Sequence, residues 1–206
     1  MIPRAIKHHI AACSFVFAVS LAWATPTPSG GPASVTLNFP QNDVGDILSL
    51  YASLTHYKII RDSVRYGPLA LSIPEPVTPQ KAIDIIEKTL FTNGFSIIQV
   101  DADTVEIDGP AKNPRANGVP TVSDASQLPT QERLVSYLFK FQHVDCAKMR
   151  DLFKQHLMPI KMYTSFLCAE DANALWVSER TSVIRQLLIA AEKLDVASTP
   201  HSDPKP

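Results

Sequence analysis

A proline-rich stretch near the middle of the chain limits what this sequence can fold into. Residues 109–131 have no apolar periodicity and contain four prolines, whereas the segments on either side alternate between strand-like and helix-like patterns. Such a composition is typical of a linker between folded units. The flanking segments, 35–108 and 132–195, are each close to the lower size limit for an independent hydrophobic core. The sequence therefore predicts two small domains, neither with room for a large ligand pocket.

The first segment, 35–108, predicts the element order β-α-β-β-α-β-β. Alternating apolar and polar residues mark the strands, and apolar residues at three- and four-residue spacing mark the helices. The helices are expected to begin after Asp43 and Thr78, whose side chains can cap a first turn. Pro74 and Pro76 are expected to end the third strand, because proline cannot donate a hydrogen bond to a strand ladder.

The second segment, 132–195, predicts the order β-α-β-β-α. Its first strand, RLVSYLFKF, has one strongly apolar face, and Asp145 can cap the helix that follows. Two helices on one side of a small sheet would form a two-layer sandwich. Both segments together predict the α+β class, and residues 196–206, rich in proline and polar residues, are expected to form a disordered tail.

The beginning of the chain resembles an export signal. Basic residues precede an uncharged apolar run at 10–24, which ends in the small-residue pattern Ala22-Trp23-Ala24. This pattern predicts a signal peptide over residues 1–24, and therefore a periplasmic protein with no membrane span after cleavage. One alternative is a retained anchor helix, although the run is shorter than the roughly 20 residues that a span needs. The other is lipidation at Cys13, although most of the apolar run follows that cysteine.

Charge and composition argue against a nucleic-acid partner. The formal net charge is −1, whereas nucleic-acid-binding domains usually carry a strongly basic face. Segment 35–108 has 10 acidic and 5 basic side chains, a formal charge of −5, and segment 132–195 has 8 acidic and 9 basic, a charge of +1. Two ordinary solvated surfaces would explain this difference. Alternatively, the acidic first segment favours a less acidic partner, since charge complementarity orients association.

No constellation in the sequence indicates catalysis or a cofactor. The histidines at 56, 143 and 156 have no metal-ligand spacing, and neither a nucleophile elbow nor a glycine-rich phosphate loop is present. The acidic stretch DADTVEID at 101–108 is expected to be a solvated hairpin, with a calcium site as the alternative. The second segment has the strand and helix order of a KH domain, but no glycine follows Gly118 to form the GXXG loop of that domain.

Two parts of the chain carry a family resemblance. The strand ALWVS (174–178), a polar hinge and the helix VIRQLLIAAEKLD (183–195), with FKFQHVDCAKMRDLFKQHL (139–157) upstream, resemble the periplasmic repeat modules of secretins. Secretins are the gated outer-membrane channels of type II secretion and type IV pili. The stretch from LNFPQNDVGDIL to DTVEI (37–107) resembles the domain that precedes those repeats, the secretin and TonB short N-terminal domain. Type II secretins are the most similar in style.

The resemblance implies a docking or assembly role and not a pore. In secretins such modules stack as periplasmic rings and dock inner-membrane components or cargo, and a β-barrel domain forms the gate. Only eleven residues follow Asp195, so we do not expect this chain to supply that barrel. The predicted function is a non-enzymatic, cofactor-free periplasmic component of a type II secretion or type IV pilus secretin machine. The alternative is a free-standing signalling or scaffold domain related to TonB-dependent transducers.

The expected partners follow from the same resemblance. They are other secretion-system proteins, such as a secretin barrel subunit or an inner-membrane platform component, or secreted cargo. The protein would then be associated with the outer-membrane complex of the cell. Ring stacking in secretins depends on many copies held together by the barrel, and single module contacts below about 1,200 Å² are weak. We therefore expect weak or no self-association of the isolated chain.

Two sets of residues are candidates for a specific role. Small open sheets leave unpaired edges to which a partner can add a strand, so Thr36, Asn38, Leu71 and Ser72 are candidate partner contacts. Internal pairing of these strands is the alternative. The remaining pair is Cys146 and Cys168, for which an oxidising periplasm permits a disulfide. The alternative is two buried thiols, since free cysteine often packs as a small hydrophobe.

Overall fold

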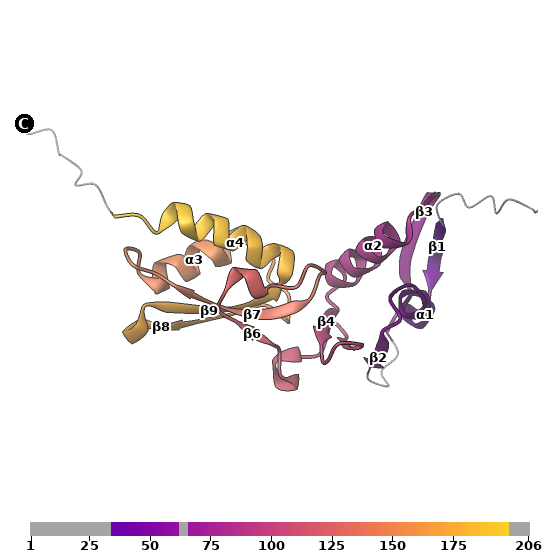
Figure 1. The fold of residues 1–206 in the computed structure, drawn as a ribbon, viewed down its shortest axis with the longest axis horizontal. Coiled ribbons are helices and arrows are strands. Elements are labelled where there is room, and N and C mark those ends of the chain that lie inside the picture. Colours follow the sequence, from indigo (N-terminus) through magenta and orange to yellow (C-terminus); the bar gives the residue numbers. More distant parts are fainter. Residues whose placement is uncertain (1–33, 62–65, 198–206) are drawn as a thin grey trace, which may run out of the picture. The chain divides into compact units, whose positions relative to one another are not determined.

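The computed structural model describes residues 34–61 and 66–197. These ranges contain four α-helices and nine strands, and the strands form three sheets. This mixture confirms the predicted α+β class (Figure 1). The predicted signal peptide at 1–24 lies outside the described residues. None of the helices in the described part of the chain is long and apolar enough to cross a membrane.

The first module comprises the elements from β1 to β5 and has the predicted order. Its two sheets are an antiparallel pair, β1-β3, and a three-stranded sheet of order β2-β5-β4, in which β2 runs parallel to β5. The elements are β1 (Val35–Asn42), α1 (Val44–Thr55), β2 (Lys58–Arg61), β3 (Leu69–Val77), α2 (Pro79–Thr92), β4 (Ser96–Gln99) and β5 (Thr104–Asp108).

The prediction that Pro74 and Pro76 end the third strand is wrong. Strand β3 continues through both prolines to Val77, which pairs with Val35 of β1. The pairing tolerates them because β3 has a partner strand on one side only and the register shifts between Val35 and Leu37. Proline occurs in sheets at such edges and irregularities, where no ladder donor is lost.

The helix ends of the first module follow the local sequence. The Asp43 carboxylate accepts from the Gly45 backbone N–H, and the Thr78 hydroxyl accepts from that of Lys81, so both predicted N-caps are present. Helix α2 ends at Thr92 with Asn93 as its C-cap, and the next residue, Gly94, has a φ of +86°. The backbone N–H groups of Gly94 and Phe95 donate to the carbonyls of Phe91 and Leu90, the two bonds of a Schellman motif.

The second module comprises the elements from β6 to α4. Its sheet has the order β6-β7-β9-β8, and α3 and α4 cover one face of it (Figure 1). The opposite face carries no helix in the part of the chain that the structure describes. After β6 the elements are β7 (Leu134–Lys140), α3 (Cys146–His156), β8 (Ser165–Ala169), a 3-10 turn η3 (Glu170–Ala172), β9 (Ala174–Arg180) and α4 (Thr181–Leu194).

The stretch predicted to be a linker has structure of its own. It contains the 3-10 turns η1 (Pro114–Asn117) and η2 (Ala125–Gln127), and between them the short strand β6 (Thr121–Val122). Strand β6 pairs in parallel with β7, and the Ser136 backbone N–H donates to the Pro120 carbonyl. Val122 is buried in the core of the second module. This part of the stretch therefore extends the sheet of the second module.

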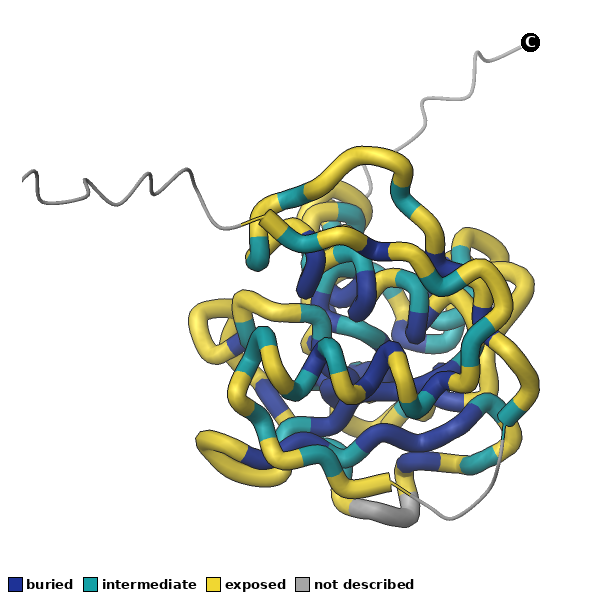
Figure 2. The backbone as a smooth tube through the Cα atoms, turned by 90° about the vertical axis from the view of Figure 1, so that its right-hand side faces the viewer, coloured by how far each residue is buried: buried dark blue, intermediate teal, exposed yellow. Residues whose placement is uncertain are grey.

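Two hydrophobic cores lie between sheets and helices. Buried residues follow the strands and the inward faces of the helices, as Figure 2 shows. The core of the first module includes Leu37, Ile47, Tyr51, Ile86 and Leu90. The core of the second includes Tyr137, Phe139, Phe153, Leu175 and Ile184, and the Phe139 ring contacts the rings of both Phe141 and Phe153.

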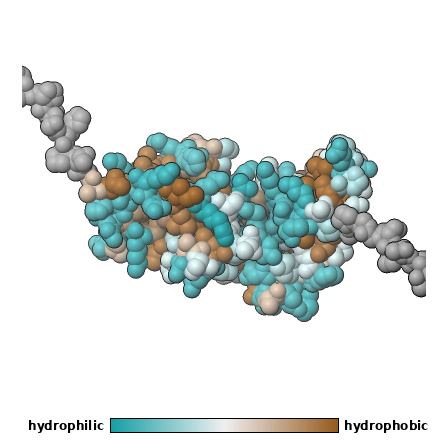
Figure 3. Space-filling model, turned by 45° about the horizontal axis from the view of Figure 1, so that its top comes forward, coloured by the Kyte–Doolittle hydropathy of each residue, from teal (hydrophilic) through white to brown (hydrophobic). Residues whose placement is uncertain are grey.

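Two leucines on the helices of the second module are exposed. Leu152 of α3 and Leu194 of α4 are 39% and 44% exposed. Each lies at the margin of its helix's apolar face, and only the middle of that face is buried against the sheet. Ile189 of α4 is also exposed. Apolar side chains accordingly lie among hydrophilic ones on the face seen in Figure 3.

Candidate functional site

The structure brings the four predicted partner contacts together. Asn38 lies opposite Ser72, and the Ser72 hydroxyl donates to the Asn38 side-chain oxygen at 3.2 Å. Thr36, Asn38 and Ser72 are exposed, whereas Leu71 is buried in the core. Strands β1 and β3 thus pair with each other, and each keeps one edge without a partner strand among the described residues. Leu71 can offer a partner only its backbone.

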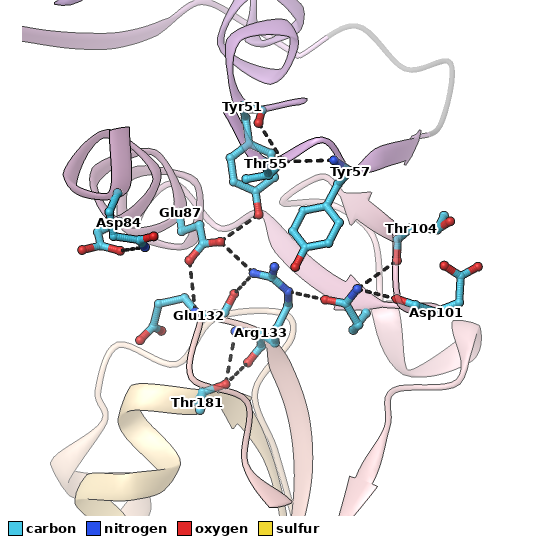
Figure 4. A network of polar contacts seen from close by, with 12 residues as sticks. Tyr51, Thr55, Tyr57, Asp84, Glu87, Asp101, Thr104, Glu132, Arg133 and Thr181 are labelled. Carbon is cyan, nitrogen blue, oxygen red and sulfur yellow. Dashed lines mark hydrogen bonds and ion pairs between the residues drawn. The ribbon is translucent and has the colours of Figure 1, made fainter. Parts of the chain in front are cut away.

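A buried polar network joins the first module to the second, a feature that we call the joint (Figure 4). Glu87 of α2 and Arg133, just before β7, are each 1% exposed. The Arg133 Nη1 donates to Glu87 Oε1 at 2.8 Å, and the Tyr51 hydroxyl donates to the same oxygen at 2.8 Å. The other oxygen, Oε2, accepts from the Glu132 backbone N–H at 3.1 Å. Glu87 therefore receives donors from both modules.

Arg133 is held on several sides. Its Nε donates to Gln99 Oε1 at 2.8 Å, and its guanidinium carbon lies 5.3 Å from the centroid of the Tyr57 ring. Its backbone N–H donates to the Thr181 hydroxyl, and its backbone carbonyl accepts from that hydroxyl at 3.0 Å. These contacts orient the guanidinium toward α2 and attach the same residue to the first turn of α4.

The charges of the joint stabilise each other. Burial opposes the charged form of Arg133, but the facing Glu87 carboxylate, which accepts a hydrogen bond from the guanidinium, helps to outweigh burial, and the net pKa of the guanidinium is raised. Burial also raises the pKa of the Tyr51 hydroxyl far above its usual value, so it stays a neutral donor. A buried ion pair with several additional hydrogen bonds is the arrangement in which attraction offsets the desolvation of both charges.

Apolar contacts extend the joint. Leu134 and Tyr163 belong by sequence to the second segment, yet both are buried in the core of the first module. The Tyr163 ring lies edge to face with Phe91 at 5.5 Å between centroids, and its hydroxyl donates to the Phe91 carbonyl at 3.3 Å. The Lys161 ammonium donates to the Thr92 carbonyl at 3.0 Å. The end of α2 is thus held directly by the loop that precedes β8.

Sequence reasoning missed the joint, although one signal was present. Glu87 lies one turn after Ile83 and directly after Ile86, on the stripe that the sequence assigns to the core, and all three are buried. A carboxylate at a core-facing helix position requires a buried donor. The position of that donor, 46 residues away in Arg133, follows only from the fold.

A second polar contact, a lock formed by Asp195, holds the end of α4 to the loop after β7 in the second module. Both Asp195 carboxylate oxygens accept backbone N–H groups of the loop after β7, from Gln142 at 2.8 Å, His143 at 2.7 Å and Val144 at 2.8 Å. Asn173 holds the same loop from the other side, since its side-chain nitrogen donates to the Val144 carbonyl at 3.0 Å. Asp195, which directly follows the last helix, therefore has a structural role: it fixes the loop after β7 to the end of α4.

Replacement of Asp195 by Ala is expected to lower the free energy of unfolding by about 1–2 kcal/mol, because three backbone donors lose a charged acceptor at a partly exposed site. Burial raises the pKa of Asp195, but the three donors outweigh it and the net pKa lies below its ordinary value. The stabilisation is therefore present above the ordinary Asp pKa of about 3.9 and is lost as pH falls through the lower folded value. Urea unfolding from pH 7 to pH 3 measures this difference.

The control for this prediction is Glu192→Ala, on an exposed position of the same helix, which should change little. Asp195→Asn should lie between the wild type and Asp195→Ala, since an amide oxygen can still accept. An Asp195→Ala variant as stable as the wild type at pH 7 would contradict the proposed lock.

The remaining candidates for chemistry are His56 and the acidic hairpin at 101–108. His56 ends α1 in the left-handed conformation with a φ of 60°, and Asp103, in the hairpin weighed as a calcium site, pairs with Lys58 at 2.7 Å. Asp101 accepts from the Asp103 backbone N–H. Among the residues that the structure describes, no group of three or more His, Cys, Asp or Glu side chains is placed to hold a metal ion.

Cys146 and Cys168 form a disulfide in the structure, with their Cα atoms 5.8 Å apart. The sequence left this pairing open beside two packed thiols. The bond connects the first turn of α3 to the edge strand β8, across the helix-covered face of the sheet. Cys146 is also only 1% exposed, as expected for a cysteine that packs as a small hydrophobic residue.

Comparison with known proteins identifies the fold. No family model matches the sequence, and no curated protein matches it. Among solved structures, the Klebsiella pneumoniae type II secretion system outer-membrane complex, with PulD, PulS and the PulC HR domain, is similar at a TM-score of 0.62 and 18% identity, over 77% of this chain and 26% of the matched chain. This protein thus spans about a quarter of that chain's length.

Two further structures match with lower scores. The N-terminal domain of the secretin XcpQ from Pseudomonas aeruginosa gives a TM-score of 0.33 at 17% identity, over 81% of this chain and 68% of that one. The Vibrio cholerae competence pilus secretin PilQ gives 0.28 at 19% identity, over 77% and 38%. The match to the Klebsiella complex shows that the described part of the chain has the fold of part of a type II secretion outer-membrane complex, in agreement with the predicted resemblance to secretin modules.

Proposed function

We propose that this protein is a periplasmic docking and assembly component of a secretin machine of the type II secretion or type IV pilus kind. The observation that carries the proposal is the pair of modules, which has the fold of part of a secretion outer-membrane complex and is held together through the buried joint. A fixed pair of modules presents its surfaces to a partner in one geometry, so less ordering is required when they bind.

The proposed partners are other secretion-system proteins. The structure with the higher similarity contains PulD, PulS and the HR domain of PulC, and another match is a GspC-GspD complex. The proposed role is interaction without catalysis. A pull-down from envelope extract tests the proposal, since secretion components should co-purify. Recovery of a TonB-linked receptor or a sigma regulator would favour the signalling alternative.

The proposed docking edge is the β1-β3 pair around Thr36, Asn38, Leu71 and Ser72. Thr36→Pro and Ser72→Pro are expected to weaken partner capture at least about tenfold by removing backbone donors and distorting the edge, because strand addition depends on main-chain bonds. Circular dichroism must first show an intact fold. Exposed Ser49→Ala on α1 is the control. Undiminished capture by correctly folded proline variants would rule out this edge.

We also propose that the isolated chain is mainly monomeric at micromolar concentration. The joint uses the buried contacts between the modules internally, and the remaining open edges are short. An interface between two such short edges would bury less than the roughly 1,200 Å² of a stable protein–protein interface, and it would therefore be weak. Light scattering on the chain from Thr25 onward should give the mass of one copy, and a stable large ring would refute the proposal.

A further inference from the structure

The outer edge of β8 lacks the features by which proteins protect an exposed strand. Strand β8 is last in the order β6-β7-β9-β8, and its sequence SFLCA contains neither a charged residue nor a proline. Its pairing with β9 runs without a register shift. By contrast, β1 contains Pro40, and β3 contains two prolines. Charges, prolines and bulges are the usual protections against strand addition, and β8 has none of them.

The register shows which backbone groups face outward. The Ser136 N–H bonds toward β6, so that of Tyr137 points toward β9, where Tyr137 lies opposite Val177. Backbone groups alternate in direction along an antiparallel ladder. Leu167, opposite Trp176, is therefore bonded to β9, and the N–H and C=O groups of the neighbouring Phe166 and Cys168 point away from the sheet.

The side chains beside this edge differ on the two faces of the sheet. On the open face Leu167 is 68% exposed and lies opposite Trp176, which is 37% exposed. Both line a hollow of about 560 Å³ that also reaches Arg115, Val119 and Ser178. On the helix-covered face, the Lys154 ammonium lies 6.0 Å from the centroid of the Phe166 ring. The open face therefore offers the apolar side chains of Leu167 and Trp176 with Arg115 in the same hollow, and the helix-covered face offers the charge of Lys154.

The charge near the edge argues against a second copy as the occupant. Antiparallel pairing of two β8 strands would place both α3 helices on one face of the joined sheet, with Lys154 near its counterpart in the other copy. Helix α3 carries Lys148, Arg150 and Lys154 against one acidic residue, Asp151. Like charges would meet, and two five-residue strands bury far less than the roughly 1,200 Å² of a stable interface.

We propose that the outer edge of β8 docks an extended segment of a partner protein in which apolar and acidic residues alternate. Side chains of an added strand point alternately to the two faces. The apolar ones would pack beside Leu167 and the hollow, and the acidic ones would face Lys154. The disulfide at Cys168 holds β8 against α3, so the edge is ordered before binding. This inference rests on the proposed docking function and adds a second edge, separate from β1-β3.

The test uses the chain from Thr25 onward and a defined probe, the capped heptapeptide Glu-Val-Glu-Leu-Glu-Val-Glu. Binding is expected to shift the amide NMR signals of β8 and to slow hydrogen exchange at Phe166 and Cys168. Leu167→Lys should weaken binding at least about tenfold, since a lysine at an edge opposes strand addition. Ala169→Lys is a second variant at an exposed position in case the first does not fold. Ile189→Lys, 56% exposed on α4, is the matched control and should bind as the wild type does.

Charge supplies the second arm of the test. The counterpart with lysine in place of glutamate should bind more weakly, and Lys154→Glu should reverse that preference. Signals that shift on β1 or β3 instead, a folded Leu167→Lys variant that binds normally, or no binding at saturating peptide would each overturn the inference. A wild-type dimer that Leu167→Lys dissociates would assign the edge to a second copy. Capture that depends on Thr36 and Ser72, without peptide binding at β8, would leave the proposed function standing and reject this inference alone.

Discussion

Replacement of Arg133 by Met is expected to lower the free energy of unfolding by about 3–5 kcal/mol, because the buried Glu87 carboxylate loses its counter-charge. Glu87 then retains only the Tyr51 hydroxyl and the Glu132 N–H as donors. Urea unfolding of the chain from Thr25 onward measures the loss. Glu87→Leu should have an effect of the same order, since it leaves the Arg133 guanidinium buried without its carboxylate.

The double variant, Arg133→Met with Glu87→Leu, should recover much of the loss. Two apolar side chains of similar size leave no uncompensated charge, and such exchanges are often close to neutral. The coupling energy of this double-mutant cycle isolates the pair. The control is the exposed pair of Lys58 and Asp103, with side chains 73% and 58% exposed, where Lys58→Met should change little. Additive losses at Glu87 and Arg133 would contradict the structural account of the joint.

The double variant also separates stability from geometry. If the charged pair serves mainly to orient the modules, the apolar version should fold but allow more than one arrangement at the joint. NMR signals of Phe91 and Tyr163, which contact each other across it, would then broaden or double. Buried polar groups specify a unique arrangement in some proteins and not in others. Sharp, single signals would show that apolar packing around Leu134 and Tyr163 is sufficient.

Local patterns in the sequence predicted most of the elements, because each element is encoded over a few neighbouring residues. The caps at Asp43, Thr78 and Asp145 are examples, since a capping side chain and the backbone N–H that donates to it are two or three residues apart. Strand β6 could not be found in this way, because two residues have no period. It forms only where Pro120 and Val122 meet the edge of β7.

Long-range contacts explain what the sequence did not predict about the site. The partners Glu87 and Arg133 lie on opposite sides of the proline-rich stretch, so no local pattern joins them. The candidate contacts Asn38 and Ser72 were correctly placed on strands, but their mutual pairing depends on the register of β1 and β3. The position of β8 at an edge of its sheet became visible only from the strand order.

Removal of the disulfide is expected to lower the free energy of unfolding by about 3 kcal/mol on the chain-entropy estimate, given the sequence separation of 22 residues between Cys146 and Cys168. The variant with both cysteines replaced by Ala tests this by urea unfolding under oxidising conditions. In the presence of a thiol reductant the wild type should lose most of its advantage over the variant. Mass measurement after alkylation gives the redox state directly. Two alkylated thiols without reductant would show that the pair is not bonded in the purified protein.

The loss should be concentrated at β8. The disulfide is the covalent attachment of an edge strand that otherwise depends on one ladder with β9 and on packing against α3. Hydrogen exchange should therefore accelerate at Leu167, whose N–H bonds to β9, more than at Tyr137 in the interior of the sheet. Helix α4, which the bond does not join covalently, provides an internal control. Uniform acceleration across the module would mean that the cross-link acts on the unfolded chain alone, and selective acceleration at β8 would mean that it also keeps this edge ordered for a partner.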